Sequence, residues 1–315
     1  MAETMKAVRI HEFGGPEVLR YEDAPRPDPA GGELLVRVHA ASVNPVDWKS
    51  RQSGGIFARA GSLPVIPGWD VSGVVEAVGP GVAGWAPGDE AFSLVRFPGI
   101  GAAYAEYATV PATEAARKPQ SLTHIQAAAI PLVALTVWQV FCEAADLQPG
   151  QRVLVHAAAG GVGHVAVQIA KAKGAYVIGT ASGRNEAFVR GLGADQFVDY
   201  TTTRFEDVVH DVDVVLDTMA GETRDRSWSV LRKGGILVSI LGDPSEEDAA
   251  RYGARGARVL VRSHGGQLAE IGRLVDEGRL RPTVGTVLPL HEAARAHELS
   301  AAGHARGKIV LEVVR

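Results

Sequence analysis

The chain has 315 residues, of which 46% are hydrophobic and 22% are charged, and its formal net charge is −4. This length can form two domains with an extensive core, and the charge gives no general attraction to nucleic acid or to an anionic membrane. We find neither a signal-peptide core nor the roughly 18 consecutive apolar residues of a membrane span. A single cysteine, Cys142, excludes intramolecular disulfides and cysteine-cluster zinc sites, so we expect a cytoplasmic protein.

Residues 1–122 alternate short β-like runs with turns rich in glycine and proline. The runs cover residues 5–10, 33–39 and 71–78, and the turns include Pro87-Gly88-Asp89. This pattern predicts a compact, mostly antiparallel β domain. Ser121 is the predicted N-cap of a helix that follows it.

Residues 123–278 alternate strands with helices, which predicts a doubly wound parallel sheet and an α/β fold. Helices are predicted over Asn185–Leu192 and Gln267–Glu277. The six predicted strands are Arg152–His156, Ala175–Thr180, Gln196–Asp199, Val212–Leu216, Gly235–Ile240 and Ala257–Val261. Residues 279–315 return to strands around one helix, Leu290–Ala301, and the final strand is predicted to rejoin the first β domain.

A glycine turn follows the first strand of the parallel sheet. Against the dinucleotide pattern G-x-G-x-x-G the chain has Ala158, Ala159, Gly160, Gly161, Val162 and Gly163, with alanine at the first glycine. Backbone N–H groups at the start of the next helix can bind a pyrophosphate, and glycines permit its close approach. Residues 159–163 are therefore predicted cofactor contacts, although an ordinary strand-to-helix turn would also explain the motif.

The end of the next strand indicates NADPH rather than NADH. NAD sites carry an acidic residue about 20 residues past the glycines, where it binds the ribose 2′-hydroxyl. This chain has Ser182 and Arg184 there, a hydroxyl and a guanidinium that suit a 2′-phosphate. The alternative is that Arg184 is a solvated loop charge.

Spaced motifs along the whole chain extend this interpretation. They are residues 41–49, 67–75, 87–89, 104–107, 134–138 and 158–163. With these motifs in this order, the chain resembles the medium-chain dehydrogenase/reductase superfamily, and most of all its zinc-free NADPH:quinone oxidoreductases, the zeta-crystallin-like family. The resemblance implies a GroES-like catalytic domain (1–122 and 279–315), a Rossmann domain (123–278), a cleft between them, a homodimer and hydride transfer from NADPH.

The resemblance also implies catalytic residues. It assigns Asn44 and Asp47 to the mouth of the nicotinamide cleft, where Asn44 would orient the acceptor oxygen and Asp47 would fix that network or relay a proton. Thr136 matches a position beside the nicotinamide. The alternatives are that Asn44 caps a turn before Pro45 and that Thr136 bonds within its own helix.

Further cofactor contacts follow more loosely from the same resemblance. Tyr200 matches a position near the adenosine 2′-phosphate, and Lys171 either reaches the phosphates or is a surface lysine. Thr218, Leu241 and Gly242 follow strands at the carboxyl edge, where such sheets bind ligands, and would line the nicotinamide side.

The departures from the superfamily's zinc enzymes bear on the chemistry. Their Gly-His-Glu stretch corresponds here to Gly68-Trp69-Asp70, and tryptophan cannot ligate zinc. We therefore expect no metal, and a conjugated acceptor, a quinone or an α,β-unsaturated carbonyl, whose developing charge hydrogen-bond donors can stabilise. An enoyl-thioester reductase and a non-catalytic NADPH-binding structural or regulatory protein remain alternatives.

The apolar segment 257–262 is the predicted sheet edge for dimerisation.

Overall fold

The computed structural model describes residues 3–60 and 62–313 and divides into two compact units. The β-rich unit comprises Met1–Leu135, Val261–Gly278 and Pro282–Arg315, and the parallel-sheet unit comprises Thr136–Leu260 and Arg279–Arg281. Residues 123–135 and 261–278 thus group with the β-rich unit, whereas the expected boundaries assign them to the other domain. Residues 1–2, 61 and 314–315, which fall within the expected domain ranges, lie outside the described residues.

The β-rich unit is built mainly from antiparallel strands. Its strands are β1 (Thr4–Ile10), β2 (Leu19–Pro25), β3 (Glu33–Val43), β4 (Asp70–Val78), β5 (Glu90–Leu94), β6 (Tyr107–Pro111), β7 (Ala115–Arg117), β14 (Val284–Pro289) and β15 (Lys308–Glu312), and its helices are α1 (Pro45–Ser53), α2 (His124–Ala128), α8 (Gly265–Asp276) and α9 (Ala293–Ala301). The main sheet has the order β14-β15-β3-β4-β5-β7, with β6 also paired to β3, while β1 and β2 form a hairpin. Only β14 and β15 run parallel among these described strands.

The pairing of β15 confirms that the end of the chain rejoins the first β domain. Ile309 lies opposite Val43 and Glu312 opposite Ala40, both on β3. The long strand β3 therefore has β15 on one side and β4 on the other. Buried valine and leucine side chains from these strands form the core of the unit.

The first helix after the β strands starts later than the sequence predicts. Thr123, not Ser121, is the N-cap of α2, and its Oγ accepts the N–H of Gln126 at 3.3 Å. Gln126 in turn accepts from the Thr123 N–H at 3.1 Å, so the two residues form a reciprocal capping box that Ser121 cannot form. Ser121 instead donates its hydroxyl to Asp276 of α8.

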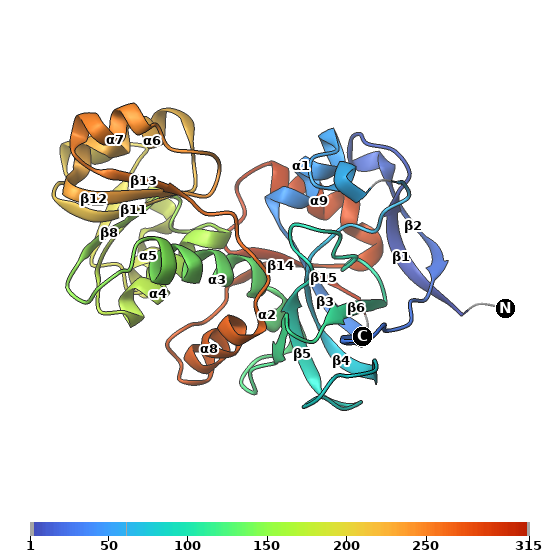
Figure 1. Ribbon diagram of the computed structural model, residues 1–315. Helices are drawn as coiled ribbons and strands as arrows, with labels where there is room; N and C mark the ends of the chain where they lie inside the picture. The colour runs from blue at the N-terminus through green and yellow to red at the C-terminus, as the bar shows by residue number, and fades with distance from the viewer. Residues whose placement is uncertain (1–2, 61, 314–315) are drawn as a thin grey trace. The chain divides into compact units, whose positions relative to one another are not determined.

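The parallel-sheet unit has the predicted six strands in its described part. They are β8 (Arg152–Val155), β9 (Tyr176–Ala181), β10 (Gln196–Asp199), β11 (Val212–Asp217), β12 (Leu231–Ser239) and β13 (Arg255–Arg258), with helices α4 (Gly161–Ala172), α5 (Glu186–Gly191), α6 (Gly221–Ser227) and α7 (Glu246–Tyr252). All neighbouring strands are parallel, in the order β10-β9-β8-β11-β12-β13. In Figure 1, α4 and α5 lie on one side of this sheet and α6 and α7 on the other. The sheet confirms the predicted α/β class, and its last strand begins two residues before the predicted Ala257.

Helix α3 (Pro131–Trp138) joins directly to a π-helical segment, Gln139–Ala144.

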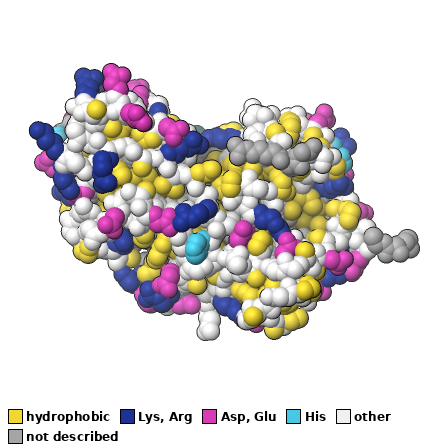
Figure 2. All heavy atoms as spheres, in the orientation of Figure 1, with side chains coloured by type: hydrophobic (Ala, Val, Ile, Leu, Met, Phe, Trp, Pro, Cys, Tyr) yellow, Lys and Arg dark blue, Asp and Glu magenta, His cyan; other side chains and the backbone are white. Residues whose placement is uncertain are grey.

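Within residues 3–60 and 62–313, no helix has the length and apolar character needed to cross a membrane. Figure 2 shows Lys and Arg side chains interspersed with Asp and Glu on the face in view.

Candidate functional site

The glycine turn lies where the strand order of the parallel sheet reverses, between β8 and β11. Open α/β sheets bind ligands at such a reversal, beyond the carboxyl ends of the strands. Helix α4 starts there, with Gly160 as its N-cap. A Cβ on Gly163 would lie 2.1 Å from the carbonyl oxygen of Ala157, so only glycine allows the helix to pack this closely on the turn. The turn thus combines a helix N-terminus with close backbone packing.

The predicted 2′-phosphate residues lie around the ends of β9 and β10. Ser182 follows β9 and its Oγ accepts from the Asn185 amide at 3.1 Å. Arg184 is exposed in the next short turn, and Tyr200, after β10, is 61% exposed. All are accessible to a ligand at this edge of the sheet.

A carboxylate that the sequence interpretation missed lies beside these residues. Asp199 ends β10, and its Oδ1 accepts from both the hydroxyl and the N–H of Thr201, at 2.7 and 2.9 Å. These hydrogen bonds, and a weaker one from the Gly183 N–H, lower the pKa of Asp199. The acid is on the third strand of the motif rather than the second, where the pattern places it, so the motif spacing gave no signal for it.

The remaining predicted cofactor residues follow β11 and β12. Thr218 donates its hydroxyl to the carbonyl oxygen of His156 at 3.1 Å, and Leu241 is 45% exposed beside Gly242. Buried Asp217 joins the two strand ends, because its Oδ2 accepts from Ser239 of β12 at 2.7 Å and its Oδ1 accepts main-chain N–H groups of the loop after β11.

Two basic residues, His156 directly before the turn and Lys171 in the last turn of α4, are engaged in internal contacts. His156 is buried, which lowers its pKa to about 4, and its ring nitrogens contact Ser227 at 2.9 Å and Thr180 at 3.2 Å. Lys171 is paired with Asp195 at 2.9 Å. Both contacts favour structural roles over acid–base catalysis or phosphate binding.

In the β-rich unit, Asn44 and Asp47 open helix α1. Asn44 is the N-cap, before Pro45, and its N–H donates to Asp47 Oδ2 at 2.8 Å. The local geometry is therefore the turn cap that the sequence leaves as an alternative for Asn44. Both side chains are fully buried.

Side-chain contacts join Asn44 to two residues that the sequence interpretation did not select as site residues. The Asn44 Nδ2 group donates to Asp70 Oδ2 at 2.8 Å, and its Oδ1 accepts from the ammonium of Lys308. Lys308 Nζ also donates to the Val43 carbonyl oxygen at 3.1 Å and lies 3.7 Å from Asp70 Oδ2. Together with Ser42, which donates its hydroxyl to Asp70 Oδ2, we call Asn44, Asp70 and Lys308 the Lys308 cluster.

Asp47 continues this network toward α9. Its Oδ2 accepts from the Tyr104 hydroxyl at 2.7 Å, and that hydroxyl lies 3.3 Å from Nε2 of His297. Burial raises the pKa of Asp47 to about 7. Its Oδ1 has no hydrogen-bond partner among the described residues, which leaves an atom on which a proton can reside.

The position that corresponds to a zinc ligand is occupied by a packed aromatic side chain. Trp69 is fully buried, stacks on Phe57 at a ring-centroid distance of 5.2 Å and donates Nε1–H to the Gly99 carbonyl oxygen at 2.6 Å. Across the described part of the chain, no three or more His, Cys, Asp or Glu side chains are grouped to hold a metal ion. Thr136 is buried in α3.

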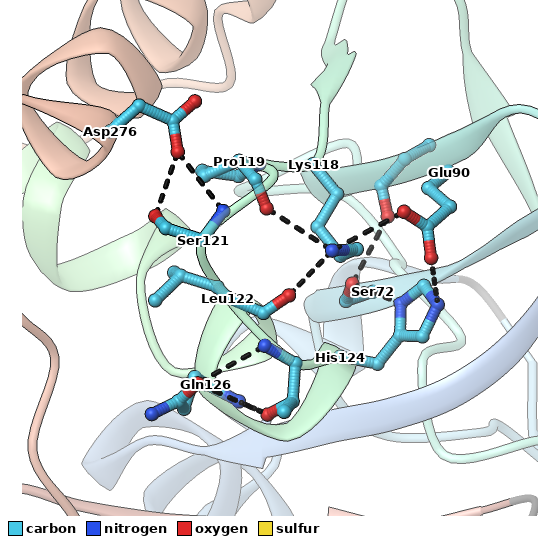
Figure 3. A network of polar contacts seen from close by, with 11 residues as sticks. Ser72, Glu90, Lys118, Pro119, Ser121, Leu122, His124, Gln126 and Asp276 are labelled. Atoms are coloured by element: carbon cyan, nitrogen blue, oxygen red, sulfur yellow. Dashed lines mark hydrogen bonds and ion pairs between the residues drawn. The ribbon is translucent and has the colours of Figure 1, made fainter.

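A second buried lysine lies elsewhere in the same unit. Lys118 Nζ donates to the carbonyl oxygens of Pro119, at 3.1 Å, and Leu122, and it lies 3.3 Å from Glu90 Oε2 (Figure 3). Glu90 also contacts Nε2 of His124 at 3.2 Å, and Ser72 contacts Nδ1 of the same histidine at 2.8 Å. We call Ser72, Glu90, Lys118 and His124 the Lys118 cluster.

Family comparisons agree with both halves of this description. Residues 30–120 match the family described as alcohol dehydrogenase GroES-like domain, and residues 192–311 match the family described as zinc-binding dehydrogenase. The chain is 34% identical to a quinone oxidoreductase of Pongo abelii, with 98% of this chain and 97% of the relative covered. It is 33% identical to the mitochondrial NAD(P)H oxidoreductase RTN4IP1 of Mus musculus, with 98% and 89% covered.

Solved structures give the same result. The quinone oxidoreductase from Coxiella burnetii matches with a TM-score of 0.92 and 37% identity over 99% of this chain and 100% of that one. Mycobacterial Rv1454c complexed with NADPH matches with a TM-score of 0.87 and 31% identity over 98% and 99%. Because these similarities span almost the whole chain, the protein belongs to the medium-chain dehydrogenase/reductase superfamily and, within it, to the zeta-crystallin-like quinone oxidoreductase family.

Proposed function

We propose that this protein is a metal-independent oxidoreductase that transfers a hydride from NADPH to a quinone or an α,β-unsaturated carbonyl. The observation that carries the proposal is the glycine turn at the strand-order reversal, where Gly163 lets α4 pack closely enough for its N-terminus to face a ligand. The family membership supports an oxidoreductase with a nicotinamide cofactor.

The residues of the parallel-sheet unit that would hold the cofactor fit its chemistry. Backbone N–H groups of residues 159–163 would bind the pyrophosphate, and Ser182, Arg184 and Tyr200 would surround the 2′-phosphate. Thr218, Leu241 and Gly242 would line the nicotinamide side. When bound, NADPH supplies the hydride.

The β-rich unit would stabilise the charge that develops on the acceptor oxygen. Trp69 offers no metal ligand, so hydrogen-bond donors would have to do this. Asn44 has a second amide N–H beyond the one donated to Asp70, and we assign it to the acceptor oxygen or to a water on that oxygen. Asp47, with its raised pKa, would exchange the proton that completes the reduction, and Thr136 would contact the substrate or the cofactor amide.

The first test is NADPH oxidation with a panel of naphthoquinones, phenanthrenequinone, enals, enones and an enoyl thioester, each repeated with a chelator and with NADH. We expect turnover that is insensitive to the chelator and faster with NADPH. Loss of activity with the chelator would disprove the metal-independent mechanism. Tight NADPH binding without turnover of any acceptor would favour a non-catalytic binding protein.

A substitution tests the cofactor preference directly. Arg184→Ala is expected to lower the preference for NADPH over NADH about tenfold or more, because a charged hydrogen bond to the 2′-phosphate is lost. Arg190→Ala is the matched control, since that arginine pairs with Glu186 on the surface of α5. An unchanged preference in Arg184→Ala would leave Arg184 as a solvated charge and turn attention to Asp199.

We also propose a homodimer that forms through β13. This strand is at the end of the sheet order, one of its edges pairs with no strand in the described part of the chain, and Leu260 just beyond it is 52% exposed. Sedimentation at micromolar concentration is expected to give a dimer, and a monomer would contradict the proposal.

A further inference from the structure

Strand register brings Asp70 and Lys308 to the end of β3. Asp70, the first residue of β4, lies opposite Ser42, and Ile309 of β15 lies opposite Val43. Asn44 follows directly, so it meets one charged residue from each neighbouring strand. Lys308 is 3% exposed and Asp70 is fully buried. Charges this deeply buried are retained only where partners compensate them.

Among the described residues, the hydrogen-bond partners of the Asp70 carboxylate are all donors. Its Oδ2 accepts from the Ser42 hydroxyl at 2.6 Å as well as from Asn44, and its Oδ1 accepts from the Leu132 N–H at 2.8 Å. Burial raises the pKa of Asp70, and the charge of Lys308 and these donors oppose that effect. A surrounding made only of donors fits the ionised carboxylate, which can only accept and which the Lys308 ammonium then balances.

These two charges determine which way the Asn44 amide points. An ammonium can only donate, so it must face the amide oxygen, and an ionised carboxylate can only accept, so it must face the amide nitrogen. Rotating the amide by half a turn would oppose donor to donor and acceptor to acceptor. The direction of the remaining Nδ2–H is thereby fixed.

We propose that Asp70 and Lys308 are a positioning pair, which locks the Asn44 amide so that its free N–H is presented in one direction for the acceptor oxygen. The same carboxylate holds Leu132, in the first turn of α3, the helix that carries Thr136. Asp70 thus contacts Asn44 directly and the helix of Thr136 through Leu132, without touching substrate itself. The inference rests on the proposed function for its catalytic consequence, but the locked amide can be observed without any turnover.

The sequence makes that observation simple, because Asn44 and Asn185 are its only asparagines. Selective ¹⁵N-asparagine labelling should give two side-chain amide pairs in the NMR spectrum, which Asn44→Ala would assign. Lys308→Met is expected to shift the Asn44 pair and to speed its hydrogen exchange about tenfold or more, while the Asn185 pair stays unchanged. Lys118→Met, which removes the other buried lysine of the same unit, is the matched control and is expected to leave both pairs unchanged.

Kinetics provide the second readout. In Lys308→Met we expect kcat to fall about tenfold to a hundredfold, since a misdirected donor loses its alignment, while the Kd for NADPH stays within about twofold. Lys308→Arg keeps a cation and is expected to recover part of kcat and the Asn44 shifts. Asp70→Asn, which keeps the side-chain shape, is the second variant if Lys308→Met does not fold; its additional amide pair is assigned by comparison.

Each outcome decides the inference. Unchanged Asn44 signals in folded Lys308→Met or Asp70→Asn would overturn it, and so would an equal fall of kcat in Lys118→Met. If the unmodified protein turns over no acceptor, the proposed function fails, and the NMR comparison still decides whether the pair locks the amide.

Discussion

Lys308 and Lys118 are two buried lysines of the β-rich unit with similar contacts and different carboxylate partners. Their side chains are 3% and 5% exposed, and each ammonium donates to at least one main-chain carbonyl oxygen. The partner of Lys308, Asp70, is completely buried, whereas the Glu90 side chain that faces Lys118 is 51% exposed. Water can therefore compensate Glu90 if its lysine is removed, and it cannot reach Asp70. Lys308 therefore pairs with a buried carboxylate, whereas Lys118 binds the main chain of Pro119 and Leu122 and a half-exposed carboxylate.

The largest expected effect is the loss of stability in Lys308→Met. The substitution leaves the Asp70 carboxylate buried without its cation, so the free energy of unfolding should fall by about 3–5 kcal/mol. Urea denaturation measures this value. A loss no greater than that of Lys118→Met would remove the distinction between the two clusters.

The next effect depends on pH and concerns Asp47, which adjoins the Lys308 cluster. Its pKa is raised to about 7 in the folded protein from an ordinary value of 3.8, so between these values the folded state holds a proton that the unfolded state has released. Asp47 therefore lowers stability as pH rises through this window, by at most about 1.4 kcal/mol per pH unit, and the full cost is present above it. Asp47→Asn should remove that dependence.

The measurement is urea denaturation of both proteins at several values between about pH 5 and pH 8, since the expected window follows from the raised pKa. The free energy of unfolding of Asp47→Asn, relative to the unmodified protein, should rise with pH. A difference that is constant, or that falls with pH, would show that Asp47 ionises at least as readily as an exposed carboxyl.

Lys118→Met is expected to cost less than Lys308→Met, about 1–2 kcal/mol. The carbonyl oxygens of Pro119 and Leu122 lose their donor, while Glu90 remains hydrated. The same denaturation experiment gives the value. A cost comparable to that of the buried pair would mean that the exposed half of Glu90 does not relieve its charge.

The smallest effect should come from Glu90→Gln, at most about 0.5 kcal/mol, because a half-exposed ion pair contributes little in water. Its urea midpoint should lie close to that of the unmodified protein. A loss above about 1 kcal/mol would indicate that the contacts of Glu90 with Lys118 and His124 act as one network.

The fold was largely predictable because its signals are local. Apolar runs, the glycine turn and the return of the final strand are visible within short windows, and the structure confirms the six-stranded parallel sheet and the antiparallel β unit. The errors are at element ends. The N-cap moved from Ser121 to Thr123, whose partner Gln126 three residues later was the overlooked signal.

The candidate site was less predictable because its members meet through strand pairing. Asn44 and Asp47 could be selected from one short motif, but Tyr104, Lys308 and His297 reach them from distant elements. A weak signal did exist. Asp70 and Lys308 are charged residues at the first positions of apolar strands. At such a position a single sequence does not reveal whether the charge is paired or hydrated.

The bond between Lys308 and Asn44 spans 264 residues of chain, and this separation has a consequence for the order of folding. During synthesis, β3, β4 and Asp70 emerge long before Lys308, and residues 136–260 of the parallel-sheet unit emerge between them. All six strands of that unit are synthesised while Asp70 still lacks its cation, so we expect the unit to fold first. When β15 then pairs with β3, the same step brings the Lys308 ammonium to the buried Asp70 carboxylate.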